Sequence, residues 1–79
     1  MKQIGDAYEN FANGIILQAV KDYRTALQAL KRNPSNYKAR YLKKDCEKFF
    51  LSGWFMELTE LDGPALMNKL RKEAGWHEE

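Results

Sequence analysis

Hydrophobic residues between positions 6 and 32 recur at the spacing of one long α-helix. At steps of about 100° per residue they fall on an arc about half the circumference wide. Asn33-Pro34 marks the end of this helix, because the residue before a proline disfavours helical conformation. We predict a helix of roughly 40 Å that contacts two others. Its apolar arc holds Tyr8, Phe11, Ala12, Ile15, Ile16, Ala19, Val20, Tyr23, Ala26, Leu27 and Leu30.

Two residues of this helix lie off the arc. Gly14 lowers helix stability by about 1 kcal/mol relative to alanine, without an obvious packing reason. Leu17 falls among polar residues such as Asn13 and Arg24, where it is either an ordinary exposed leucine or a partner contact. The breadth of the arc adds a further alternative, in which part of it is buried in a homodimer.

A second helix is predicted from residue 35 or 36 to residue 51, after a turn rich in capping residues. Its core face carries Ala39, Leu42, Cys46, Phe49 and Phe50 at i, i+3, i+7, i+10 and i+11.

Another face of the second helix places Tyr37 and Tyr41 one turn apart and continues with Lys44 and Lys48. These four residues are called the Tyr–Lys ridge below. The ridge is either a solvated basic face, whose lysine stems cover tyrosine rings, or a contact surface. Further basic residues nearby are Lys38, Arg40 and Lys43.

Two shorter elements follow. Ser52-Gly53 precedes a short helix to about residue 61, in which Trp54, Leu58 and Leu61 recur at i, i+4 and i+7. Asp62-Gly63-Pro64 starts the last helix, and Gly75 ends it. That helix directs Leu66, Met67, Leu70 and Ala74 inward and Lys69, Arg71 and Lys72 outward. Trp76 folds back onto the core or stays exposed, and residues 77–79 form a frayed tail.

Four large aromatic residues gather around the Ser52-Gly53 break. The register predicts that Phe49, Phe50, Trp54 and Phe55 form the centre of the core rather than an exposed binding element. Phe49→Ala is then expected to cost about 3–5 kcal/mol if the ring is fully buried.

The predicted fold is all-α: a small bundle of three main helices, the last preceded by a short helix, in one domain spanning residues 1–79. The longest apolar run, residues 15–17, is far shorter than a membrane span, and the N-terminal residues do not follow the order of a signal peptide. A lone cysteine fits a reducing compartment, so we expect a cytoplasmic protein.

The titratable residues give no catalytic pattern. Cys46 lies on the apolar face, where a thiol stays protonated, and His77 falls in the predicted tail. The carboxylates alternate with bases as in helix ion pairs, and the glycines are scattered singly. We therefore predict a protein that is not an enzyme and holds no cofactor or metal. A net charge of +2 permits nucleic-acid binding without implying it.

Three stretches carry a resemblance: ANGIILQAVKDYRTAL, KRNPSNYKARYLKKDCEKFFLSGWF and LTELDGPALMNKLRKE. Together they cover most of residues 8–73. They resemble short proteins of phages, prophages and mobile elements of Gram-positive bacteria, with a similar long first helix, double phenylalanine, Gly-Trp-Phe element and Leu-x-x-Leu-Asp-Gly turn. The resemblance implies stoichiometric binding to host machinery, including CRISPR-type defence nucleases, and transfers no catalytic or ligand residues.

Two functions follow as hypotheses. The first is a binding module that occupies a site on a host protein or nucleoprotein complex, as an anti-defence inhibitor of the anti-CRISPR kind. The alternative is a small basic protein that binds nucleic-acid phosphates directly. Under both hypotheses the candidate contact residues are Tyr37, Lys38, Arg40, Tyr41, Lys44, Lys48, Lys69, Arg71 and Lys72.

Overall fold

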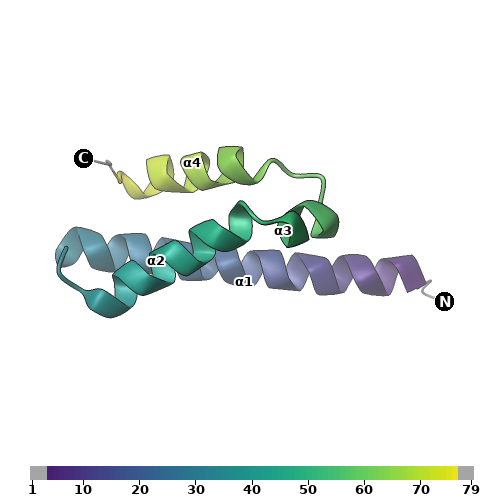
Figure 1. Cartoon of the computed structure of the whole chain (residues 1–79), viewed down its shortest axis with the longest axis horizontal. Coiled ribbons are helices and arrows are strands. Elements are labelled where there is room, and N and C mark those ends of the chain that lie inside the picture. Colours follow the sequence, from purple (N-terminus) through teal and green to yellow (C-terminus); the bar gives the residue numbers. More distant parts are fainter. Residues whose placement is uncertain (1–3, 77–79) are drawn as a thin grey trace.

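The structure, a computed structural model, describes residues 4–76 of the 79-residue chain, and that range folds as an all-α bundle. Its helices are α1 (Ile4–Arg32), α2 (Tyr37–Phe50), α3 (Gly53–Leu58) and α4 (Gly63–Ala74). In Figure 1, α1 runs the length of the molecule, α2 and α4 lie along its C-terminal half, and α3 lies farther toward its N-terminus. None of the helices in residues 4–76 is long and apolar enough to cross a lipid bilayer.

Local capping contacts fix three of the four helix starts and confirm the predicted order of elements. The side chain of Asn36 accepts a hydrogen bond from the backbone N–H of Ala39, and Ser52 does the same for Phe55. Asp62 caps α4 by accepting from the N–H of Ala65. At its other end α4 stops at Gly75, whose φ of +67° lies in the left-handed region that favours glycine.

The core lies where α1, α2, α3 and α4 meet. Its largest fully buried side chains are Tyr23, Leu27, Phe50, Phe55 and Leu70. The rings of Phe50 and Phe55 meet edge to face, with centroids 5.8 Å apart, which is a favourable geometry for aromatic pairs. The predicted core face of α2 is confirmed, since Ala39, Cys46 and Phe50 are buried while Leu42 and Phe49 pack against the core from its edge.

The first turns of α1 correct the predicted apolar arc. Tyr8 and Phe11 are exposed, Phe11 by 62 %. Helix α1 has 29 residues and α2 only 14, so at about 1.5 Å per residue α1 extends well past its neighbour. The arc is buried or partly buried from Ala12 onward, where α2, α3 and α4 lie beside α1, and Phe11 is exposed because it faces the open side between α1 and α2.

The aromatic cluster is core only in part. Phe50 and Phe55 are buried, but Trp54 is 54 % exposed and Leu61 is also exposed. The prediction assumed one helix continuing to residue 61, whereas α3 ends at Leu58 and the chain becomes extended at the following residue. Within this short helix Phe55 and Leu58 face the core. The inward placement of Trp54 and Leu61 was therefore wrong. The early end of α3 accounts for the exposure of Leu61. Trp54 is exposed because Phe55, the next residue, takes the inward position of this short helix.

Candidate binding surfaces

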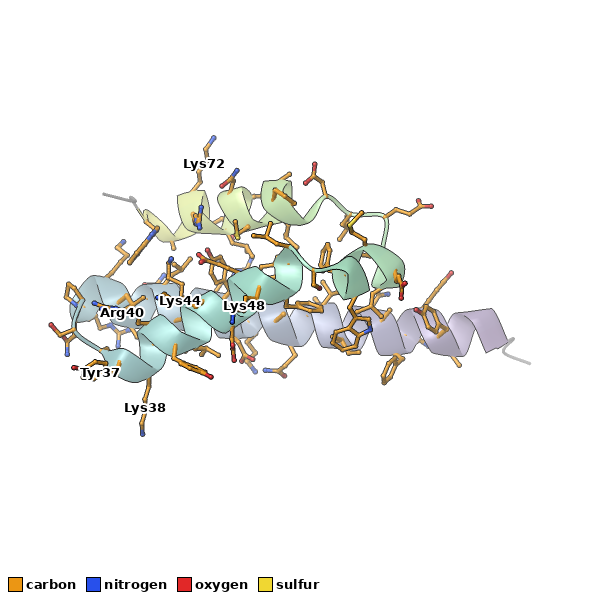
Figure 2. The ribbon with its side chains drawn as sticks, viewed as in Figure 1. Tyr37, Lys38, Arg40, Lys44, Lys48 and Lys72 are labelled. Atoms are coloured by element: carbon orange, nitrogen blue, oxygen red, sulfur yellow. The ribbon has the colours of Figure 1, made fainter. Side chains whose placement is uncertain are left out.

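The Tyr–Lys ridge lies on the outer side of α2. Helix α2 begins after the Asn36 cap, and its periodicity places Cys46 in the core and the ridge on the opposite face. Tyr37 and Tyr41 are 84 % and 70 % exposed, and Lys44 and Lys48 are exposed beside them. In Figure 2 the side chain of Lys38 extends away from the lower edge of α2.

Three lysines of this face have no ion-pair partner among the described residues. Among residues 7–76, Lys38, Lys44 and Lys48 make no ion pair or hydrogen bond through their side chains. Arg40 donates a hydrogen bond from Nη2 to the carbonyl oxygen of Pro34 at 2.9 Å, which leaves its charge unpaired. An anionic partner can therefore approach this face without first breaking internal ion pairs.

Charge is segregated along the molecule. Apart from Lys2, every lysine and arginine of the chain lies in residues 21–48 or 69–72. Residues 3–20 and 49–68 hold no lysine or arginine and carry five carboxylates, Asp6, Glu9, Glu57, Glu60 and Asp62. Residues 21–48 and 69–76, called the basic half below, form the part of the bundle built from α2 and the C-terminal ends of α1 and α4 (Figure 1). The net charge of +2 is therefore the sum of a strongly basic half and an acidic remainder.

The basic residues of α4 do not join the ridge. Lys69 and Lys72 are exposed as predicted, and in Figure 2 Lys72 projects from the edge of the molecule opposite Lys38. Arg71 does not point outward: its side chain is only 22 % exposed and turns toward α2. The predicted contact residues therefore fall on two separate surfaces, with Arg71 between helices.

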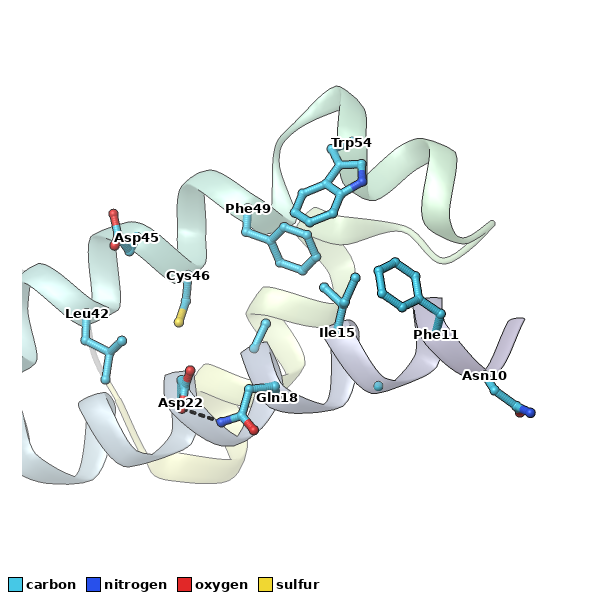
Figure 3. A pocket seen from close by; sticks show the side chains of 12 residues that line it. Asn10, Phe11, Ile15, Gln18, Asp22, Leu42, Asp45, Cys46, Phe49 and Trp54 are labelled. Atoms are coloured by element: carbon cyan, nitrogen blue, oxygen red, sulfur yellow. Dashed lines mark hydrogen bonds between the residues drawn. The ribbon is translucent and has the colours of Figure 1, made fainter. Parts of the chain in front are cut away.

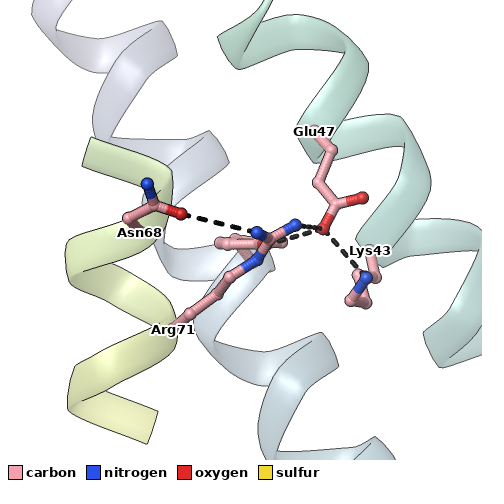
Figure 4. A network of polar contacts seen from close by, with 5 residues as sticks. Lys43, Glu47, Asn68 and Arg71 are labelled. Atoms are coloured by element: carbon pink, nitrogen blue, oxygen red, sulfur yellow. Dashed lines mark hydrogen bonds and ion pairs between the residues drawn. The ribbon is translucent and has the colours of Figure 1, made fainter. Parts of the chain in front are cut away.

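Arg71 belongs to a polar network that joins three helices (Figure 4). Its Nη2 donates to Glu47 Oε2 at 2.8 Å, and its Nε donates to the hydroxyl of Tyr23 at 2.9 Å. That hydroxyl in turn donates to Glu47 Oε2 at 2.7 Å, and Lys43 Nζ lies 2.9 Å from the same oxygen. Lys43 also lies over the ring of Trp76, which is partly buried against the core, as one of the predicted alternatives had it. The network thereby fixes α4 against α1 and α2.

The network sets the ionisation of its members. Burial alone would raise the pKa of Glu47, but hydrogen bonds from Arg71, Lys43 and Tyr23 outweigh it and hold that pKa below its usual range. Burial raises the pKa of Tyr23 strongly, and its hydrogen bond to Glu47 adds to the effect. Glu47 is therefore ionised and Tyr23 neutral across the physiological range.

The lowered pKa of Glu47 predicts an acid-sensitive contribution to stability. A carboxyl whose pKa is lower in the folded than in the unfolded chain stabilises the fold above the unfolded value of about 4.3. That stabilisation is lost as the pH falls through the folded pKa. We expect Glu47→Gln to cost about 1–3 kcal/mol at pH 7 and much less near pH 3. Urea unfolding of both proteins at the two pH values measures this, and an equal cost at both would contradict it.

An apolar groove between α1 and α2 was not predicted from the sequence (Figure 3). It has a volume of about 700 Å³ and is open to solvent. Its apolar lining is Phe11, Gly14, Ile15, Ala19, Leu42, Cys46, Phe49 and Trp54, and its polar lining is Asn10, Gln18, Asp22 and Asp45. The exposed rings of Phe11 and Trp54 stand at one end of it. The periodicity of α1 placed several of these residues correctly on an apolar face, but it could not show that a side of the helix pair lies uncovered.

Cys46, at the floor of this groove, is a packing residue. Burial, followed by the charges of Asp22, Asp45 and Glu47, raises the pKa of its thiol to about 11, so the reactive thiolate is scarce at neutral pH. Within residues 7–76 no three His, Cys, Asp or Glu side chains gather in a way that could hold a metal ion. His77 and the predicted tail lie outside the described residues.

Comparisons of the chain with protein-family models, with curated proteins and with solved structures found no match. The function is therefore inferred from the Tyr–Lys ridge and the groove between α1 and α2.

Proposed function

We propose that this protein is a non-catalytic binding module that docks through the Tyr–Lys ridge onto an anionic surface of a partner protein or nucleoprotein complex. The observation that carries the proposal is the set of exposed, unpaired lysines beside Tyr37 and Tyr41 on one face of α2. Tyrosine and arginine are favoured at the centres of interfaces, because they combine large contact area with hydrogen bonding. Arg40, next to the ridge, supplies the second of these residue types.

Charge segregation supports the same surface. A partner with negative charge is attracted to the basic half and repelled by the end that holds Glu9, Glu57 and Glu60, which orients the encounter. The resemblance to phage proteins makes host machinery the first partner class to test. We propose stoichiometric inhibition of a cytoplasmic defence complex, such as a CRISPR-type nuclease, as the form that this binding takes.

The proposal is tested by affinity capture from a lysate of a Gram-positive host, with and without nuclease treatment. We expect a protein partner recovered in stoichiometric amount, whose recovery falls as salt is raised because the contact is electrostatic. A capture that recovers no such partner counts against the proposal.

Direct nucleic-acid binding is the second candidate, and the two exposed tyrosines beside exposed lysines favour it. Tyrosine rings stack on bases, while lysines contact phosphates. Titration with DNA and RNA at about 50 and 200 mM salt decides, because counterion release makes true phosphate binding fall steeply between these concentrations. Weak binding that is the same at both concentrations removes this candidate.

A further inference from the structure

The groove between α1 and α2 is the uncovered side of a helix pair. Helix α4 packs on the other side of the pair, where Arg71 reaches Tyr23 and Glu47, and behind the groove in Figure 3. The groove follows α1 from Phe11 to Asp22, about 16 Å or three helical turns. This is the length and apolar character of a site for one further helix, as in helix-in-groove recognition.

Its charge identifies the kind of helix that fits. The basic half contains four carboxylates, Asp22, Asp45, Glu47 and Glu73. Glu47 pairs with Arg71 and Lys43, and Glu73 pairs with Arg24. Asp22 and Asp45, which line the groove on α1 and α2, make no ion pair within residues 7–76, although cations surround them in the sequence. A cationic side chain that reaches either carboxylate would form an ion pair at contact distance, which the more distant and screened cations of the basic half do not cancel.

Gly14 leaves open space on the groove side of α1. It lowers the stability of α1 as an interior glycine, and a Cβ built on it would have no atom within 4 Å. Packing within the chain therefore does not require this glycine. It lines the groove between Phe11 and Ile15, where the missing side chain lets another backbone approach closely.

We propose that the groove binds one amphipathic helix of another protein, with its apolar side chains between Phe11, Phe49 and Trp54 and a lysine or arginine near Asp22 and Asp45. This surface is distinct from the Tyr–Lys ridge, so the inference does not rest on the function proposed for the ridge. A second copy of the chain is the competing occupant, and the sedimentation result described below distinguishes it from another protein.

The test uses a labelled helical peptide of about 15 residues, with leucines at i, i+3, i+4 and i+7 and lysines at one end. A matched peptide carries glutamates in place of the lysines. Fluorescence anisotropy should show saturable binding of the lysine peptide and weaker binding of the glutamate peptide. Asp22→Asn combined with Asp45→Asn should remove most of that preference.

Variants locate the binding. Trp54→Ala and Gly14→Leu should each weaken the lysine peptide by about tenfold or more, the first by removing an aromatic anchor and the second by filling the groove. Leu17→Ala, at an exposed residue that does not line the groove, should bind it like the wild type. Circular dichroism checks that each variant is folded.

Three results would overturn the inference. The first is the absence of saturable binding to either peptide. The second is equal affinity for the lysine and glutamate peptides, since the two carboxylates would then select nothing. The third is a dimer in sedimentation at micromolar concentration that Gly14→Leu converts to a monomer, because the groove would then belong to a second copy of the chain.

Discussion

Gly63→Ala should lower the melting temperature by about 15 °C or more, the largest effect expected of any single methyl group in this protein. A Cβ at Gly63 would stand 1.8 Å from the carbonyl oxygen of Phe50 and 2.9 Å from its carbonyl carbon. Both are backbone atoms, so no side-chain rotation can relieve the overlap. The end of α2 and the start of α4 would have to separate, at a cost of about 3 kcal/mol or more.

Gly14→Ala is the matched control for this substitution. The same methyl group is added there in open space within a helix, and it should raise stability by about 0.5–1 kcal/mol through the higher helix propensity of alanine. Thermal unfolding followed by circular dichroism measures both variants. If Gly63→Ala melted close to the wild type, the contact between Gly63 and the carbonyl of Phe50 would be wrong.

Phe55→Ala should cost about 3–5 kcal/mol, which approaches the whole stability expected of a domain this small. The ring is 0 % exposed and meets Phe49 and Phe50 edge to face, at centroid distances of 5.4 and 5.8 Å. Its removal leaves a cavity beside the rings of Phe49 and Phe50. The variant should therefore unfold at much lower urea concentration than the wild type.

Phe49→Ala and Trp54→Ala test whether the loss of stability follows the burial of each ring or only the removal of an aromatic side chain. Phe49 is only partly buried, so the condition attached to its predicted cost of 3–5 kcal/mol is not met and we expect a smaller loss. Trp54, more than half exposed, should lose less again. Urea midpoints in the order Phe55→Ala, Phe49→Ala, Trp54→Ala, from least to most stable, are expected. The reverse order would contradict the burial of Phe55 and the exposure of Trp54.

The helix order was predictable because its signals are local. Asn33-Pro34, Asp62-Gly63-Pro64 and Gly75 act through the conformations that these residues prefer, whatever they pack against. Burial was less predictable, since it depends on where the neighbouring helices end. Tyr8 is exposed because α2 does not extend far enough to cover it. The periodicity of α1 contains no information about the length of α2.

Contacts between residues far apart in the chain could not be predicted from the sequence. Arg71 stands at the border of the inward face of α4, and its position does not reveal partners 48 and 24 residues away in Tyr23 and Glu47. The apolar groove was hidden for the same reason, because it depends on the side of the α1–α2 pair that α4 covers. The ridge was predictable because a single helix supplies all of it.

The assignment of the Tyr–Lys ridge as the binding surface is tested most directly by comparing two charge-reversed variants in the same host-lysate capture. Lys44→Glu/Lys48→Glu alters the ridge, and Lys69→Glu/Lys72→Glu makes the same change of charge on the outer face of α4. All four lysines are exposed, so both variants should fold and have equal net charge. We expect the ridge variant to lose the captured partner and the α4 variant to keep it. Retention by the ridge variant, or equal loss in both, would contradict the assignment of the Tyr–Lys ridge as the binding surface.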